Sequence, residues 1–153
     1  MSSLELIWYE KNLKALNFIN EFDIMLNYNK SFGRRVVTLS KNDIELGRFY
    51  IDGEDLLDMS IYIEEDSNEL RGKGLAKLMI GFLIINMVKT ELVRKDQLVF
   101  IDADASAGFW DKIGMKPNRY YERNQRNISG SGYEKVITFS KLSKWALGIP
   151  LGI

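Results

Sequence analysis

The 153-residue chain contains no cysteine and no histidine. The missing cysteines exclude disulfide bonds, thiolate nucleophiles and Cys–His pairs, and the missing histidines exclude Ser–His–Asp triads. Together the two absences remove nearly all zinc sites. Histidine is also the usual general base near neutral pH. Any chemistry must therefore depend on carboxylates, tyrosines, lysines, hydroxyls or backbone dipoles, and a reaction without a covalent enzyme intermediate fits this limit best.

The chain also has no net charge and no apolar run long enough to cross a membrane. The chain has 21 Lys and Arg against 21 Asp and Glu, so nothing global favours nucleic acid or a membrane surface as a partner. The opening MSSLELIWYE lacks the order of a signal peptide, and the apolar stretch Leu75 to Val88 is too short to span a bilayer. With 46% hydrophobic residues, the sequence predicts one soluble, cytoplasmic domain over residues 1–153.

The first half of the chain predicts one helix and several strands. Leu13, Leu16, Ile19 and Phe22 fall on one face of a helix over residues 11–22. Strand patterns, the last with a clear period of two, cover residues 4–9, 35–40, 44–51 and 57–63. The polar turn between the second and third of these predicts an antiparallel hairpin. The first is nearly as well explained by a helix, and residues 23–33 give no prediction.

The second half predicts alternating helices and strands. Residues 75–89 are apolar on nearly every face, which is typical of a buried helix, and Gly114 can end a short helix over residues 106–113. Strands are predicted over residues 97–103, 119–122 and 133–139, the first of them buried on both faces. The order indicates an α/β (α+β) domain with a single mixed sheet flanked by helices.

Residues 71–76 read RGKGLA and precede the buried helix. Gly72 and Gly74 allow left-handed dihedrals and a close approach of backbone to ligand. The helix directs its free N–H groups and positive dipole end toward this loop, and Arg71 and Lys73 add positive charge. The pattern favours an anion, in particular a phosphate. The alternative is a turn that only caps the helix. A dinucleotide-binding loop is disfavoured because it would need a third glycine at the position of Lys77, and a Walker loop is excluded because the sequence G-x-x-x-x-G-K-S/T is absent.

Two motifs together resemble the GNAT family of N-acetyltransferases. Arg71, Gly74 and Ala76 match its Arg/Gln-x-x-Gly-x-Gly/Ala signature. About thirty-five residues later, residues 108–115 (GFWDKIGM) resemble its second motif, and one helix and one strand separate the two, as in that family. The resemblance extends over residues 57–115. It implies a GNAT-like acyl-CoA N-acyltransferase fold with a mostly antiparallel central sheet.

The resemblance further implies an acetyl-CoA site without a metal. Backbone N–H groups of residues 72–76 would hold the pyrophosphate, and the strand over residues 57–63, splayed from the strand over residues 97–103, would pair with the pantetheine arm. The acetyl group would pass to a primary amine by direct attack in a ternary complex. The cofactor-binding residues implied are Ile61, Tyr62, Ile63, Arg71, Gly72, Lys73, Gly74, Leu75, Ala76, Ser106 and Trp110.

The acid–base residues are less well defined. The family's usual acid is a tyrosine in the second motif, where this chain has Trp110, and an indole cannot donate a proton in this way. Tyr120 or Tyr121 is a substitute, unless the thiolate leaves unassisted. Glu64 is the favoured base because it ends the central strand. Asp102 and Asp104 compete with it, and each carboxylate is equally explained as a solvated strand-end residue.

Charge and the chain end bear on partners. No lysine or arginine lies between Arg48 and Arg71, where eight carboxylates occur. If these line the acceptor cleft, they favour a small-molecule or side-chain amine, including a polycation. The apolar residues 145–153 predict docking onto the core or onto a second copy in a homodimer. Two other functions stay open: a CoA-binding or regulatory module without transfer, favoured by Trp110, and a nucleotide-binding domain preferring ATP or NAD.

Overall fold

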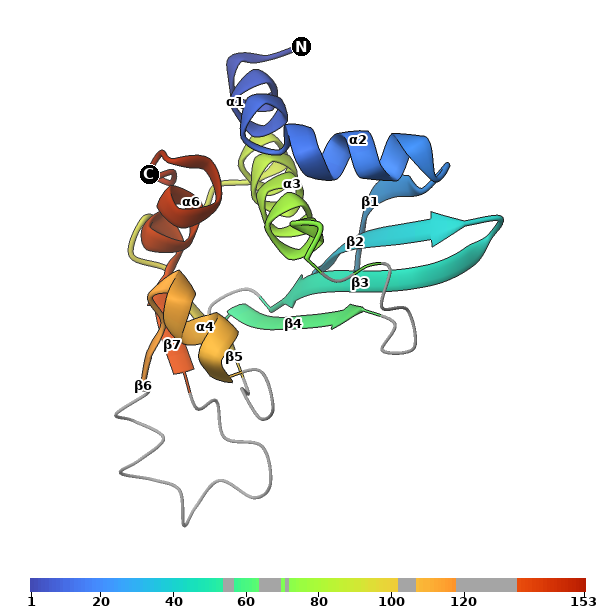
Figure 1. Cartoon of the computed structure of the whole chain (residues 1–153). Helices are drawn as coiled ribbons and strands as arrows, with labels where there is room; N and C mark the ends of the chain where they lie inside the picture. Colours follow the sequence, from blue (N-terminus) through green and yellow to red (C-terminus); the bar gives the residue numbers. More distant parts are fainter. Residues whose placement is uncertain (54–56, 64–69, 71, 102–106, 118–134) are drawn as a thin grey trace.

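A seven-stranded sheet with a long helix across one face organises the fold (Figure 1). The structure is a computed structural model, and it describes residues 1–53, 57–63, 70, 72–101, 107–117 and 135–153. The strand order is β1-β2-β3-β4-β5-β7-β6, and of the pairings described only β4 with β5 is parallel. The predicted fold class, a single mixed and mostly antiparallel sheet flanked by helices, is confirmed.

The elements follow the predicted order in the main, with additions at both ends. In chain order they are α1 (Ser3–Lys11), α2 (Leu13–Glu21), β1 (Met25–Ser31), β2 (Arg34–Lys41), β3 (Ile44–Asp52), β4 (Leu57–Ile63), α3 (Leu75–Thr90), β5 (Leu98–Ile101), α4 (Ala107–Ile113), β6 (Lys116–Pro117), β7 (Lys135–Thr138) and α6 (Phe139–Leu147). The strand predicted over residues 119–122 lies outside the described residues.

Residues 4–9 form part of α1, so the strand predicted there is wrong and the helix that explained them nearly as well is confirmed. Ser2 caps this helix: its hydroxyl oxygen accepts a hydrogen bond from the Glu5 backbone N–H at 3.2 Å. The indole N–H of Trp8 donates to the Leu78 carbonyl at 3.0 Å, which fastens α1 to α3. The amphipathic α2 confirms the helix predicted over residues 11–22.

Two tight hairpins build the first half of the sheet. β2 and β3 pair antiparallel, as predicted, and the turn between them places Asn42 and Asp43 at φ 52° and 64°. Asparagine and aspartate tolerate this left-handed region better than other non-glycine residues. β1, which no pattern predicts, pairs antiparallel with β2 through a turn at Phe32 and Gly33. β4 then adds to the free edge of β3.

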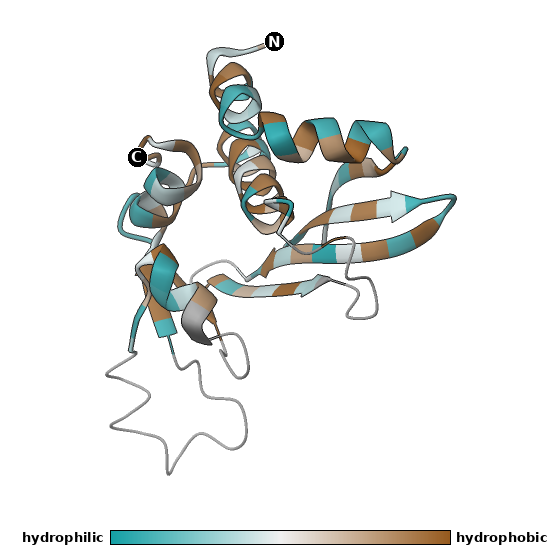
Figure 2. Ribbon diagram, in the orientation of Figure 1, coloured by the Kyte–Doolittle hydropathy of each residue, from teal (hydrophilic) through white to brown (hydrophobic). Residues whose placement is uncertain are grey.

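The core lies between the sheet and α3. Alternate residues of β2 and β3, including Val37, Leu39, Phe49 and Ile51, are completely buried. α3 is apolar on nearly every side because the sheet, α1, α2 and α6 all pack around it (Figure 2). A Cβ added at Gly81 would lie 2.9 Å from the Trp8 ring, so glycine permits the close contact of α1 with α3.

A buried ion pair ties β2 to the C-terminal end of α3. The Arg35 side chain is 6% exposed and donates to both carboxylate oxygens of Glu91, at 2.6 and 3.0 Å. A third hydrogen bond from this guanidinium reaches the Gly53 carbonyl at 2.7 Å. Lys30 also lies 3.2 Å from the Glu91 carboxylate. The buried guanidinium of Arg35 therefore has three hydrogen bonds and a counter-ion.

In the second half, the short helix and its glycine stop are confirmed. α4 ends at Ile113, and Gly114 has φ 103°. β5 confirms a strand within residues 97–103, but its predicted burial on both faces is wrong, since Leu98 is 41% exposed. The sheet face opposite α3 leaves that side chain uncovered by the described elements.

The predicted last strand runs too far. β7 ends at Thr138, whose hydroxyl oxygen accepts from the Lys141 backbone N–H and caps α6, a helix absent from the prediction. The apolar chain end docks onto its own chain: the Ile153 N–H donates to the Val93 carbonyl, and the Lys95 N–H donates to the Ile153 carbonyl. Among the described residues, no helix has the length and apolar character needed to cross a membrane.

Candidate functional site

The glycine loop adopts the left-handed backbone that the sequence predicts. Gly72 has φ 71° and Gly74 has φ 75°, and Gly74 is the N-cap of α3. None of the described side chains caps this helix, and the Leu78 N–H is the first to reach an acceptor of the same helix, the Gly74 carbonyl at 3.1 Å. The N–H groups of residues 75–77 therefore have no intrahelical acceptor. They form a set of donors at the positive end of a 16-residue helix.

The space around the two glycines fits a bound diphosphate. A Cβ at Gly72 would meet nothing within 4 Å, and one at Gly74 would meet only the Ala15 Cβ, at 3.8 Å. Described side chains therefore do not fill the loop. Backbone donors in a left-handed turn followed by a helix N-terminus are suited to phosphate groups. The residues present thus fit the pyrophosphate of a coenzyme.

Two lysines flank this N-terminus, each held over an aromatic ring. The Lys73 ammonium lies 5.3 Å from the centroid of Phe18 in α2, and the Lys77 ammonium lies 5.3 Å from a ring centroid of Trp145 in α6. The first turn of α3 contains no acidic residue. Ring faces attract cations without neutralising their charge, so the local potential stays positive.

β4 precedes the glycine loop along the chain. Among the described residues it pairs in parallel with β5 through Leu57 with Val99 and Asp58 with Phe100, and it pairs antiparallel with β3 as far as Ile63. Ile61 lies near the end of β4 and is half-buried, and Tyr62 beside it is 47% exposed. The end of β4 and the glycine loop thus belong to one chain segment, residues 57–76.

Trp110 lies in the core. Its side chain is 1% exposed, and its ring packs edge-on against Phe109 at 4.8 Å between centroids. Phe109 in turn lies edge-on to Trp145, with centroids 6.2 Å apart. The aromatic pair of the second motif therefore fixes α4 to the core and to α6. Contact of Trp110 with a cofactor stays a prediction.

The structure brings together one part of the predicted site. Gly72, Lys73, Gly74, Leu75 and Ala76 form the start of α3, and the strand carrying Ile61, Tyr62 and Ile63 leads toward it. The remaining predicted residues lie outside the described residues, and their roles stay predictions: Glu64, Arg71, Asp102, Asp104, Ser106, Tyr120 and Tyr121. Within the described part of the chain, no group of three or more acidic residues is placed to hold a metal ion.

Sequence reasoning missed the contribution of α6. The site prediction did not include Trp145, although this residue lies beside the first turn of α3. A usable signal was present: Phe139, Leu142, Ala146 and Leu147 recur at helical spacing and are all buried. Gly148, at φ 78°, ends this helix.

Comparison with known proteins gives a limited result. No family model matches the chain, and no curated protein matches it. Among solved structures, it is similar to one from Desulfovibrio desulfuricans that is described as a candidate acetyltransferase of the GNAT family. The TM-score is 0.41 and the identity 14%, over 56% of this chain and 57% of the other. The chain thus matches little more than half of that structure, and a likeness of this strength carries no argument about activity.

Proposed function

We propose that the protein is an N-acetyltransferase that transfers an acetyl group from acetyl-CoA to a primary amine. The observation that carries the proposal is the N-terminus of α3, which no described side chain caps, with Gly72 and Gly74 at positive φ on the chain segment that follows β4. A diphosphate fits this helix start, and an extended arm would run from it along β4. The two motifs that resemble the GNAT family support the same ligand.

The chain's own residues would act mainly by holding two substrates together. Backbone N–H groups of residues 72–76 would bind the pyrophosphate, while Lys73 and Lys77 add positive charge beside it. The strand β4 would orient the pantetheine arm through its backbone. Acetyl-CoA supplies an activated thioester, so transfer to a bound amine needs no covalent intermediate on the enzyme. This route suits a chain without cysteine or histidine.

Proton transfer from the amine would be the more demanding step. A lysine-like amine has a pKa of about 10.4, roughly three units above neutral, whereas a leaving thiol has a pKa of about 8.5. Loss of a base would therefore lower the rate more than loss of an acid. Glu64 is the proposed base, with Asp102 as its competitor and Tyr120 as the candidate acid. The acidic segment before residue 71 favours a cationic acceptor.

A second function, a CoA-binding module without transfer, is favoured by one observation. Trp110 occupies the motif position of the family's usual acid and is buried in the core at 1% exposure. Such a module would bind the coenzyme and leave the thioester intact. Turnover of acetyl-CoA with a panel of amines, including polyamines, aminoglycosides and lysine peptides, separates the two functions.

Calorimetric titration tests coenzyme binding, which both proposed functions require. We expect the protein to bind acetyl-CoA and to bind ATP and NAD at least tenfold more weakly, because those ligands lack the pantetheine arm that follows β4. Dissociation constants for the three ligands at one ionic strength are the measurement. Absence of acetyl-CoA binding would refute the proposal, and a preference for ATP or NAD would favour a nucleotide-binding domain instead.

Replacement of Glu64 by glutamine should reduce turnover more at pH 7 than at pH 9. At the lower pH nearly all of the amine is protonated and depends on the base, while at the higher pH a larger fraction is already neutral. A pH profile of kcat/KM over this range, with Glu45→Gln as a surface control, measures the effect. A loss that does not vary with pH would exclude Glu64 as the base.

A further inference from the structure

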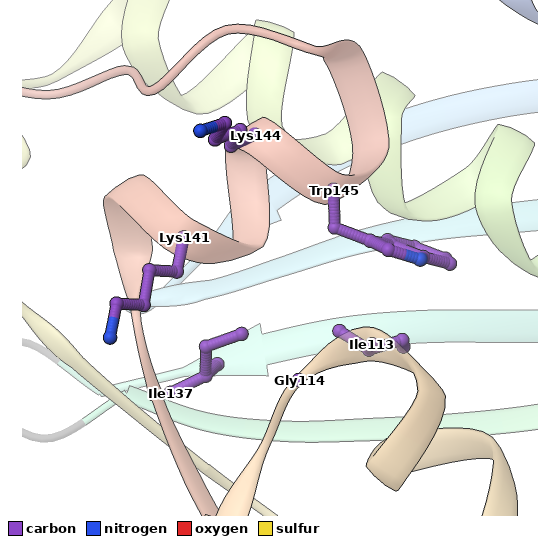
Figure 3. Close-up of a pocket in the computed structure, with 6 residues that line it drawn as sticks. All are labelled: Ile113, Gly114, Ile137, Lys141, Lys144 and Trp145. Carbon is purple, nitrogen blue, oxygen red and sulfur yellow. The ribbon is translucent and has the colours of Figure 1, made fainter.

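A cavity lies beside Trp145, between α4, β7 and α6. Its volume is about 310 Å³. Figure 3 shows its walls: Ile113, Gly114 and Ile137 lie on one side, and α6 with Lys141, Lys144 and Trp145 lies on the other. The lining residues are Ile113, Gly114, Ile137, Lys141, Lys144 and Trp145. The size matches small-ligand sites, which typically combine apolar walls with a few polar groups.

The two lysines give the cavity uncompensated charge. Lys141 and Lys144 are three residues apart on α6, so they lie on one side of the helix. Neither ammonium forms an ion pair with any of the described residues, whereas several other lysines and arginines of the chain do. Two neighbouring cations at an apolar wall favour a ligand that carries an anionic group on an apolar or aromatic body.

Trp145 connects this cavity with the coenzyme cradle. Its indole forms one wall of the cavity, and the same ring system lies 5.3 Å from the ammonium of Lys77, in the first turn of α3. Phe109 packs edge-on against the ring and holds it in place. An aromatic wall can take the base of a phosphorylated nucleoside, and the helix start and the two lysines can each take one of the phosphates that its ribose carries.

We propose that this cavity binds a phosphorylated nucleoside, with the base against Trp145 and a phosphate paired with Lys141 and Lys144. Its occupant in the transfer reaction is the 3′-phosphoadenosine end of coenzyme A, a point that rests on the proposed function. The nucleoside site itself does not rest on that function, because binding to Trp145, Lys141 and Lys144 requires no acetyl transfer. In this proposal α6 contacts the ligand as well as packing against α3.

Adenosine 3′,5′-bisphosphate is the probe for the site, with adenosine as the uncharged comparison. We expect the bisphosphate to bind the wild type and to bind the double variant Lys141→Gln/Lys144→Gln roughly 10- to 100-fold more weakly, since charge-assisted contacts are lost. Binding of adenosine should not change. The double variant Lys14→Gln/Lys41→Gln removes the same charge at positions on α2 and β2, away from the cavity, and should retain wild-type affinity. Equal bisphosphate affinity in the wild type and the cavity variant would overturn the proposal.

Coenzyme A and dephospho-coenzyme A, which lacks the 3′-phosphate, then identify the source of the nucleoside. The wild type should prefer coenzyme A, and the cavity variant should bind both alike. Failure of both coenzymes to bind, with bisphosphate binding still dependent on the lysines, refutes the proposed function and supports the nucleoside site. Equal wild-type affinity for the two coenzymes supports the function and refutes the assignment of this cavity to the coenzyme.

Discussion

Replacement of Gly74 by glutamate is expected to weaken acetyl-CoA binding by at least roughly 100-fold. The new carboxylate would lie at the positive end of α3, where it competes for the same N–H donors and repels a diphosphate. Its Cβ also enters a cradle that is open apart from Ala15 at 3.8 Å. Calorimetric titration of the variant with acetyl-CoA measures the loss.

The control for this variant is Gly33→Glu. Gly33 has φ 79°, against 75° at Gly74, and a Cβ there would meet nothing within 4 Å, where one at Gly74 would meet only the Ala15 Cβ at 3.8 Å. Both substitutions therefore carry a similar backbone strain, about 1–2 kcal/mol, and the same charge. Only the one on α3 should affect binding. If Gly74→Glu retains wild-type affinity, the assignment of this loop as the diphosphate cradle is incorrect.

Replacement of Glu91 by glutamine is expected to lower the free energy of unfolding by about 2–4 kcal/mol. The substitution leaves the Arg35 guanidinium, 6% exposed, without its bidentate counter-ion. A buried charge that loses its partner is costly, because the desolvation penalty is no longer offset. Urea denaturation of both proteins at pH 7 gives the difference.

Glu45→Gln is the matched control. Glu45 also pairs bidentately with an arginine, Arg48, but both side chains are more than a third exposed. Exposed pairs of this kind contribute about 0–1 kcal/mol. A similar loss in the two variants would contradict the view that burial, rather than pairing alone, makes the Glu91 contact important.

The pH dependence of stability provides an independent readout of the same contact. Burial alone would raise the pKa of Glu91, but hydrogen bonds and charges of Arg35 and Lys30 outweigh it and hold the pKa below its ordinary 4.5. A lowered pKa in the folded state gives stability that is present above the unfolded value and is lost as pH falls through the folded value. The wild type should therefore lose more stability below about pH 4.5 than Glu91→Gln does.

The parts of the fold predicted from sequence are those with a strong local pattern. The strand over residues 57–63 alternates strictly, and the apolar run from Leu75 can only be a covered helix. α1 was mistaken for a strand because its apolar residues give almost no amphipathic pattern, although the Ser2 cap and Glu5 in the first turn marked a helix start. β1 is polar on one side, so its identity depends on pairing with β2 rather than on its own residues.

The candidate site likewise contains residues that a local sequence pattern predicts and one that no local pattern predicts. Gly72 and Gly74 could be predicted because a left-handed turn before a helix requires a particular residue type at a particular place. Trp145 could not be predicted as a site residue, since nothing local indicates that it lies beside Lys77, 68 residues earlier in the chain. Long-range contacts of this kind are set by how α6 packs on α3, and that packing is a property of the whole core.

The helix layer links the two sectors of the sheet mechanically. The sheet consists of an antiparallel sector from β1 to β4 and a smaller sector of β5, β7 and β6. α3 packs against β2 in the first sector and against α6, which in turn packs against β7 in the second. A force that pulls the two sectors apart must therefore also break the packing of α3, beside which the proposed coenzyme would bind.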